Sequence, residues 1–196
     1  NIAIAPAPNI SKAAIKISKL LASNGGLFVL DNKHYYPHIT LYMTEFPTKN
    51  LGSIKQILKD ISSNAKPIEL FFSNYRKNSR GYIGASFKRT KELLKLHKEV
   101  VLALNPLREG LVRENDIAKI LEFSKARQKN IKLYGYDAVH EQFIPHLTFT
   151  KLKDVKNMLI KLSKFNFSFR AKEIAVFQTA EHGTCVKILA RYKLGQ

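Results

Sequence analysis

The sequence contains a single cysteine, Cys185, and no tryptophan. One cysteine excludes an intramolecular disulfide, so the cysteine content gives no indication of an oxidising compartment. No apolar run approaches the roughly 18 residues that a membrane-spanning helix requires, which argues against stable insertion in a membrane. Acidic residues are scarce, with 15 Asp and Glu against 33 Lys and Arg and a formal net charge of +18. We therefore expect a soluble globular protein whose charge attracts polyanions.

The basic residues are spread along the chain rather than gathered in a tail. Charge of this sign favours RNA, DNA or an anionic lipid surface, although a lysine-rich solvated surface explains the same composition. Two basic clusters are candidates for guiding an RNA backbone, namely Arg76 and Lys77 with Arg80, and the run 125–129. For either cluster alone, a solvated helix face or loop is the simpler interpretation.

The length of 196 residues suits one large domain or two small lobes in close contact. We expect a single bilobal domain over residues 1–196, and a monomer. The recorded chain opens at Asn1, without Met and inside an apolar run, which indicates missing upstream residues. A cytoplasmic location is the default expectation, and this opening leaves a periplasmic or secreted location open.

Hydrophobic periodicity predicts a mixture of helices and strands. Strands are expected at 2–5, 27–30, 35–46, 67–75, 82–87, 142–151, 165–178 and 185–192. Helices are expected from an N-cap at Ser11 to the pair Gly25-Gly26, and around 51–61, 93–104, 117–123 and 155–162. A basic loop is expected at 125–132 and a polar turn at 179–184.

One five-residue pattern occurs twice in the chain. Residues 37–41 read Pro-His-Ile-Thr-Leu, and residues 145–149 read Pro-His-Leu-Thr-Phe. An amphipathic helix and then an apolar strand follow each copy. Such self-similarity indicates an internal duplication that covers about half of the chain. A third His-x-Thr, at 182–184, lacks the proline and the apolar neighbours, and we interpret it as a coincidence in a polar turn.

Strand geometry gives the repeated pattern a chemical meaning. Alternation places His38 and Thr40 on one face of the first strand, and His146 and Thr148 on one face of the second. Each preceding proline removes a ladder donor, which favours a position at an edge or an entrance. If the two halves pack about a pseudo-twofold axis, two imidazoles and two hydroxyls face one another across a cleft.

These four groups fit the needs of phosphodiester chemistry. One imidazole can take a proton from water or a hydroxyl while the other gives a proton to the leaving oxygen, each transfer contributing about 10²–10⁴-fold. The two hydroxyls can donate to non-bridging phosphate oxygens. The sequence does not decide which histidine is the acid and which is the base.

Other interpretations of the same residues stay open at this point. Two ordinary strand histidines with local hydrogen bonds are the structural alternative. Zinc usually takes three or four protein ligands, and no cysteine or carboxylate accompanies either pattern, so we expect neither a metal nor a cofactor. His97 lies on an amphipathic helix and is expected at the surface or its boundary. Tyr36 and Tyr42 are placed on the face of His38 and Thr40, where they could stack a nucleobase or pack in the rim or core.

The two patterns, about a hundred residues apart, resemble the 2H phosphoesterase superfamily, and in particular its branch of bacterial 2′-5′ RNA ligases and cyclic phosphodiesterases. The resemblance implies an α+β fold, bilobal through internal duplication, with antiparallel sheets flanked by helices around a central cleft. It puts His38, Thr40, His146 and Thr148 on catalytic positions. Lys151 stands where many relatives have an arginine, so it would contact substrate as a point charge.

The function implied by this resemblance is a metal-independent phosphodiesterase. Its expected partner is an RNA end or a nucleotide that carries a 2′,3′-cyclic phosphate or a 2′-5′ linkage. Met43 stands where a phenylalanine is usual, and together with Lys151 it leaves the substrate class open. The alternatives are a related enzyme for another phosphoester, such as cyclic ADP-ribose phosphate, and a basic RNA-binding module with an inactive cleft.

Overall fold

The computed structural model describes residues 1–154 and 165–196. In this part of the chain every strand pairing is antiparallel. The strands are β1 (Ile2–Ile4), β2 (Ile39–Tyr42), β3 (Ile68–Leu70), β4 (Phe72–Lys77), β5 (Tyr82–Phe87), β6 (His146–Lys151), β7 (Phe169–Ala171), β8 (Glu173–Thr179) and β9 (Cys185–Lys193). Seven of them form one sheet in the order β4-β5-β6-β2-β1-β8-β9, and β3 pairs separately with β7.

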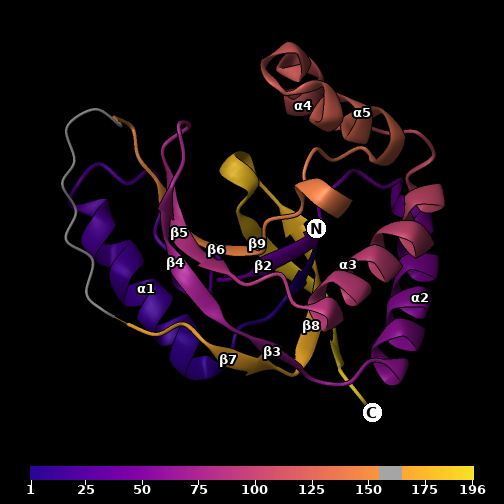
Figure 1. The fold of residues 1–196 in the computed structure, drawn as a ribbon, viewed down its shortest axis with the longest axis horizontal. Coiled ribbons are helices and arrows are strands. Elements are labelled where there is room, and N and C mark those ends of the chain that lie inside the picture. Colours follow the sequence, from indigo (N-terminus) through magenta and orange to yellow (C-terminus); the bar gives the residue numbers. More distant parts are fainter. Residues whose placement is uncertain (155–164) are drawn as a thin grey trace.

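The helices pack against the sheet and flank the strands in the view of Figure 1. They are α1 (Pro8–Ala22), α2 (Leu51–Asn64), α3 (Lys91–Leu104), α4 (Glu114–Ala118) and α5 (Lys125–Tyr134). Helices α4 and α5 stand apart from the others at one end of the molecule (Figure 1). None of the helices in the described ranges has the length and apolar character to cross a membrane. The predicted α+β fold with antiparallel strands and flanking helices is confirmed.

The strand order contains an internal twofold pattern. The succession β1-α1-β2, then β3 and β4, is repeated as β5-α3-β6, then β7 and β8. Strands β2 and β6 are neighbours at the centre, each has the first strand of its own repeat beside it, and β8 and β4 follow outward. Helix α1 packs on β6 and α3 packs on β2, so each repeat covers the central strand of the other.

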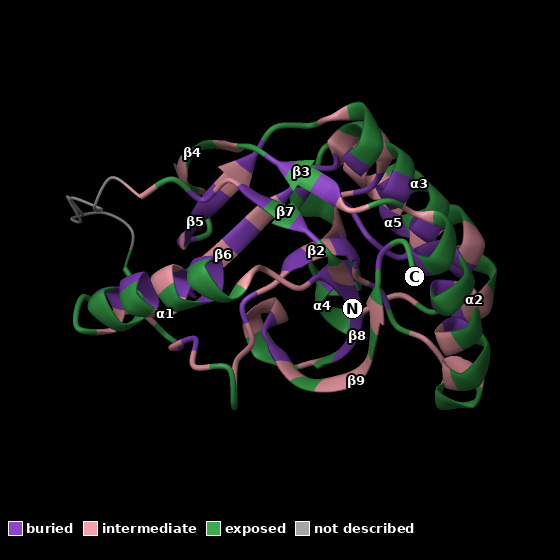
Figure 2. Ribbon diagram, turned by 90° about the horizontal axis from the view of Figure 1, so that it is seen from below, coloured by how far each residue is buried: buried purple, intermediate pink, exposed green. Residues whose placement is uncertain are grey.

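An apolar stripe fixes each helix against the sheet. In α1 the residues Ile10, Ala14, Ile17 and Leu21 recur at helical spacing and are buried. Ser18 shares this stripe because its hydroxyl donates to Phe149 O at 2.7 Å, which satisfies a polar group inside the core. Figure 2 shows the result as stripes of buried and exposed residues along α1 and α2, while the strands between them are mostly buried.

Three of the predicted elements differ from the structure for reasons that the contacts explain. Helix α1 begins at Pro8, three positions before the predicted N-cap. Proline is tolerated in a first turn because the backbone N–H groups there have no hydrogen-bond partner within the helix. Residues 27–30 form no strand, since the hydroxyl of Thr150 bonds both the N–H and the C=O of Phe28 in place of a backbone partner. The predicted basic loop is helix α5, whose apolar signal is weak because it buries only Ile131.

Two further helix predictions have other outcomes. The helix expected at 117–123 is divided between α4 and a 3₁₀ turn at Ile120–Glu122. The helix expected at 155–162 lies outside the described residues.

His97 was predicted at the surface or its boundary, and that prediction is wrong. Its side chain lies on α3 with 1% of its surface exposed and stacks on the ring of Phe143 at 3.9 Å between centroids. The backbone N–H of His140 donates to its Nε2 at 2.9 Å, so Nδ1 carries the proton and donates to Leu41 O at 2.8 Å. Burial lowers the pKa of His97 to about 4. This neutral imidazole ties α3 to β2 and to the turn before β6.

Gly84 permits the close pairing of β5 with β6. A Cβ atom at this position would overlap the carbonyl oxygen of Leu147 in the neighbouring strand, and backbone cannot yield as a flexible side chain can. We expect Gly84→Ala to lower the free energy of unfolding by about 1–3 kcal/mol, measured by urea denaturation. Gly52→Ala is the matched control, because nothing lies within 4 Å of its Cβ position in α2. Equal effects of the two substitutions would contradict the steric account.

Candidate active site

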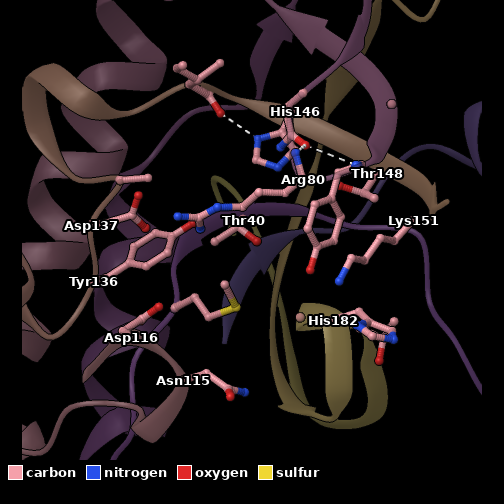
Figure 3. Close-up of a pocket in the computed structure, with 18 of the residues that line it drawn as sticks. Thr40, Arg80, Asn115, Asp116, Tyr136, Asp137, His146, Thr148, Lys151 and His182 are labelled. Carbon is pink, nitrogen blue, oxygen red and sulfur yellow. Dashed lines mark hydrogen bonds between the residues drawn. The ribbon is translucent and has the colours of Figure 1, made fainter. Parts of the chain in front are cut away.

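A cleft of about 680 Å³ opens on the sheet between the two copies of the repeated pattern. Its walls come from β2, β6, the β4–β5 hairpin and the α4–α5 segment, by which we mean residues 113–138. Figure 3 shows His146, Thr148 and Thr40 around the opening, with Lys151 and His182 on one side and Tyr136 and Asp137 on the other.

The pairing of β2 with β6 brings the four predicted catalytic residues together. Ile39 stands opposite Leu147 in an antiparallel register, so His38 lies across from Thr148 and Thr40 lies across from His146. Ile39 and Leu147 point into the core with 0% exposure, whereas all four His and Thr side chains line the cleft. Each histidine therefore lies opposite the threonine of the other copy of the pattern.

Both histidines are held in the same tautomer by a backbone carbonyl two residues earlier. His38 Nδ1 lies 2.9 Å from Tyr36 O, and His146 Nδ1 lies 2.7 Å from Ile144 O. A carbonyl oxygen only accepts hydrogen bonds, so each Nδ1 carries a proton. In the neutral ring this leaves Nε2 as the atom that exchanges protons in the cleft.

The surroundings of the two imidazoles differ. Burial lowers the pKa of His146 to about 4, and the charge of Arg76 adds to this effect. Burial also acts to lower the pKa of His38, but the neighbouring Cys185 and the hydrogen bond to Tyr36 O together act in the opposite direction, and the net result is a raised pKa. Near neutral pH, His146 is therefore uncharged while His38 holds its proton more firmly than an ordinary histidine.

The two threonines offer hydroxyl groups to the cleft. Thr40 Oγ1 accepts a hydrogen bond from Asn1 Nδ2 at 3.3 Å, and the same amide lies 3.3 Å from Cys185 Sγ. Within residues 1–154 and 165–196, Thr148 Oγ1 has no hydrogen-bond partner. Each hydroxyl thus keeps a donor for a bound anion.

Positive side chains surround the cleft, and three of its arginines have acidic partners. Arg127 pairs with Asp137 at 2.6 Å, and Arg113 Nε bonds Asp116 at 2.8 Å. Lys151, which was predicted to contact substrate, does line the cleft, with its ammonium 5.5 Å from the centre of the Tyr82 ring. The described residues contain no group of three or more His, Cys, Asp or Glu placed to hold a metal ion.

The two predicted stacking tyrosines do not line the cleft. Tyr42 is fully buried and its hydroxyl donates to Tyr134 O at 2.6 Å, so its predicted place beside His38 is wrong. A bulge explains this difference, because β1 pairs Ala3 with Thr40 and then Ile2 with Tyr42, which breaks the alternation of faces. Tyr36 is half-buried against Phe177 and contributes its backbone carbonyl to the orientation of His38.

The third His-x-Thr, interpreted from sequence as a coincidence, also lies at the cleft. His182 and Thr184 line the wall opposite the α4–α5 segment, and the His182 ring stacks on Phe28 at 6.3 Å. Thr184 Oγ1 donates to Glu181 O at 2.8 Å and so serves the local turn. Nothing in the spacing indicated this position, which depends on the contact of the β8–β9 hairpin with the segment before β2, where Tyr36 N–H donates to Cys185 O at 2.9 Å.

Comparisons with known proteins agree with the family resemblance and with the fold. A family profile described as the 2′-5′ RNA ligase superfamily matches residues 27–183. The structure of Escherichia coli LigT complexed with 3′-AMP superposes with a TM-score of 0.65 at 16% identity, covering 100% of this chain and 97% of that one. The structure of TT0787 from Thermus thermophilus gives 0.64 at 14% identity, with 99% and 96% covered. No curated protein sequence matches the chain significantly.

Removal of the sulfur beside His38 tests the electrostatic difference between the histidines. We expect Cys185→Ala to lower the pKa of His38, because burial then acts without the opposing effect of Cys185. Nuclear magnetic resonance titration of the imidazole protons measures both histidines in one sample, and the titration of His146 should move far less than that of His38, because Cys185 is not among the causes of its shift. An unchanged His38 titration would show that Cys185 has no part in setting its charge.

Proposed function

Because the chain belongs to the 2′-5′ RNA ligase superfamily, we propose that it is a 2H-type phosphodiesterase that uses His38 and His146 as general acid and base. Its substrate is an RNA end or nucleotide with a 2′,3′-cyclic phosphate or a 2′-5′ linkage. The observation that carries the proposal is the register of β2 on β6, which puts two imidazoles and two hydroxyls in one cleft. Residues 1–196 act as one bilobal unit, with one His-x-Thr from each repeat.

For a cyclic phosphate the reaction is the addition of water. His146 takes a proton from the water through Nε2 while the water oxygen forms a bond to phosphorus. The bond from phosphorus to the ribose 2′ or 3′ oxygen breaks, and His38 gives its proton to that oxygen. Thr40 and Thr148 donate to the non-bridging oxygens, where charge builds up in the transition state.

The assignment of acid and base follows from the surroundings of each ring. A base must be unprotonated at the working pH, which suits His146 with its pKa of about 4. An acid must keep its proton, which suits His38, whose pKa is raised by Cys185 against the effect of burial. Each group is expected to contribute about 10²–10⁴-fold.

The charge of the cleft and the comparisons support a nucleotide substrate. Arg76 and Lys151 line the cleft beside the His–Thr pairs, and phosphate oxygens are the natural partners of such groups. Structures of E. coli LigT with 3′-AMP and with ATP have the same fold. A nucleotide bound in the cleft of the present chain would place its phosphate between His38 and His146.

Substitution of either histidine tests the two-histidine mechanism. We expect His38→Ala and His146→Ala each to lower kcat by about 10²-fold or more on uridine 2′,3′-cyclic phosphate in EDTA. His34→Ala is the matched control, because His34 is exposed and pairs with Asp31 outside the cleft. Near-normal rates in both cleft variants, with folding retained, would remove the mechanism.

The pH profile tests the assignment of roles. The active state has His146 neutral and His38 protonated, so kcat/KM should rise with pH through about 4 and fall above the ordinary histidine value of 6.5. A p-nitrophenyl leaving group needs no proton, so His38→Ala should lose far less activity on thymidine 3′-(p-nitrophenyl phosphate) than His146→Ala loses. The opposite ranking would exchange the two roles.

A further inference from the structure

Arg76, on β4, is a cation in the cleft without an acidic partner. Its side chain is half-buried, and within residues 1–154 and 165–196 it makes no ion pair or hydrogen bond. Burial lowers the pKa of Arg76, and the neighbouring Arg127 acts in the same direction. A charge removed from water in this way is unfavourable unless a partner of opposite charge arrives. The partner that this position lacks is an anion.

The other arginines of the cleft are already neutralised. Arg113 and Arg127 pair with Asp116 and Asp137, and Arg80 lies 3.6 Å from Glu122 while its guanidinium stacks on Phe123 at 4.4 Å. These pairs fix the α4–α5 segment and leave little attraction for a ligand. Arg76 therefore stands out by its surroundings rather than by its residue type.

The register of three strands directs Arg76 toward the catalytic residues. Arg76 pairs with Gly84 on β5, and Gly84 pairs with Thr148 on β6. Residues opposite one another across antiparallel strands have side chains on the same face. Gly84 has no side chain and could not acquire one without striking the carbonyl of Leu147. The path from Arg76 to Thr148 is consequently open, and the charge of Arg76 acts on the pKa of His146.

Strand spacing shows which anion Arg76 can reach. Neighbouring strands lie about 4.8 Å apart, and Arg76 on β4 is two strands away from Thr148 on β6. A phosphate held midway between β6 and β2 is half a strand spacing farther, which puts it about 12 Å from the Arg76 Cα. The side chain extends about 6 Å, since it has five bonds of about 1.5 Å in a zigzag. Subtracting this length from the distance of about 12 Å leaves roughly 6 Å between the guanidinium carbon and the reacting phosphorus. That gap suits the next phosphate of a nucleotide chain better than the reacting one.

We propose that Arg76 forms a subsite for a second phosphate, the one on the 5′ side of the terminal nucleotide. The inference rests on the proposed function, and it narrows the substrate class to RNA ends that carry at least two phosphates. The planar guanidinium holds this phosphate through paired hydrogen bonds. The reacting phosphate remains with the two His–Thr pairs.

Binding measurements test the subsite without turnover. The probes are the dinucleotide UpUp and its analogue with a neutral methylphosphonate between the two uridines. We expect the parent protein to bind UpUp about tenfold more tightly than the analogue by isothermal titration calorimetry, and Arg76→Gln to reduce this preference to about twofold or less. Arg76→Lys keeps the charge and should keep part of the preference. Lys59→Gln, on the exposed side of α2, removes the same charge far from the cleft and should leave the preference intact.

Steady-state kinetics provide a second, independent test of the subsite. Arg76→Gln should lower kcat/KM about tenfold on UpU ending in a 2′,3′-cyclic phosphate and less than about twofold on uridine 2′,3′-cyclic phosphate. Equal losses on both substrates would put Arg76 on the reacting phosphate and overturn the subsite, as would an UpUp preference that survives in Arg76→Gln. A parent that binds UpUp with the preference but hydrolyses neither substrate would refute the proposed activity and leave the subsite standing.

Discussion

The pairing of β2 with β6 is the contact on which the site depends. Each strand carries its histidine and threonine on the cleft face and its apolar residues on the core face, so one antiparallel register aligns both sets. A slip by a single residue would turn the His and Thr side chains into the core. The helices stabilise this register from outside, because α1 packs on β6 and α3 packs on β2. The duplicated fold thereby makes one cleft from two copies.

The duplication gives two similar histidines, and their neighbours make them different. Cys185 from β9 lies beside His38, and Arg76 from β4 acts on His146, although both rings bond a backbone carbonyl two residues earlier. Acid and base roles require opposite charge states at one pH. The outer strands of the sheet, which are not equivalent in the two halves, supply that difference. The same asymmetry places the guanidinium of Arg76, which has no partner among the described residues, on the His146 side of the cleft, where we propose that the substrate extends.

The sequence predicted what depends on local pattern. The two Pro-His-apolar-Thr copies identified the central strands and the four cleft residues, because strand alternation is a property of each strand alone. The place of Tyr42 depends on a bulge in the pairing with β1, and that of His97 depends on partners from two other segments. The sequence names Arg76 as a basic candidate. The direction of its side chain, however, depends on the cross-strand register that pairs Arg76 with Gly84 and Gly84 with Thr148. The pairing of residues from strands far apart in the chain cannot be predicted from the local pattern of one sequence.

The most direct measurement is a crystal structure of the protein with a uridine–vanadate complex, in which vanadium stands for the reacting phosphorus. We expect vanadium between β2 and β6, with the Nε2 atoms of His146 and His38 on opposite apical oxygens and both threonine hydroxyls on equatorial oxygens. His38 should meet the ribose oxygen and His146 the oxygen that stands for water. Vanadate bound by one histidine only, or outside this cleft, would contradict the two-histidine mechanism.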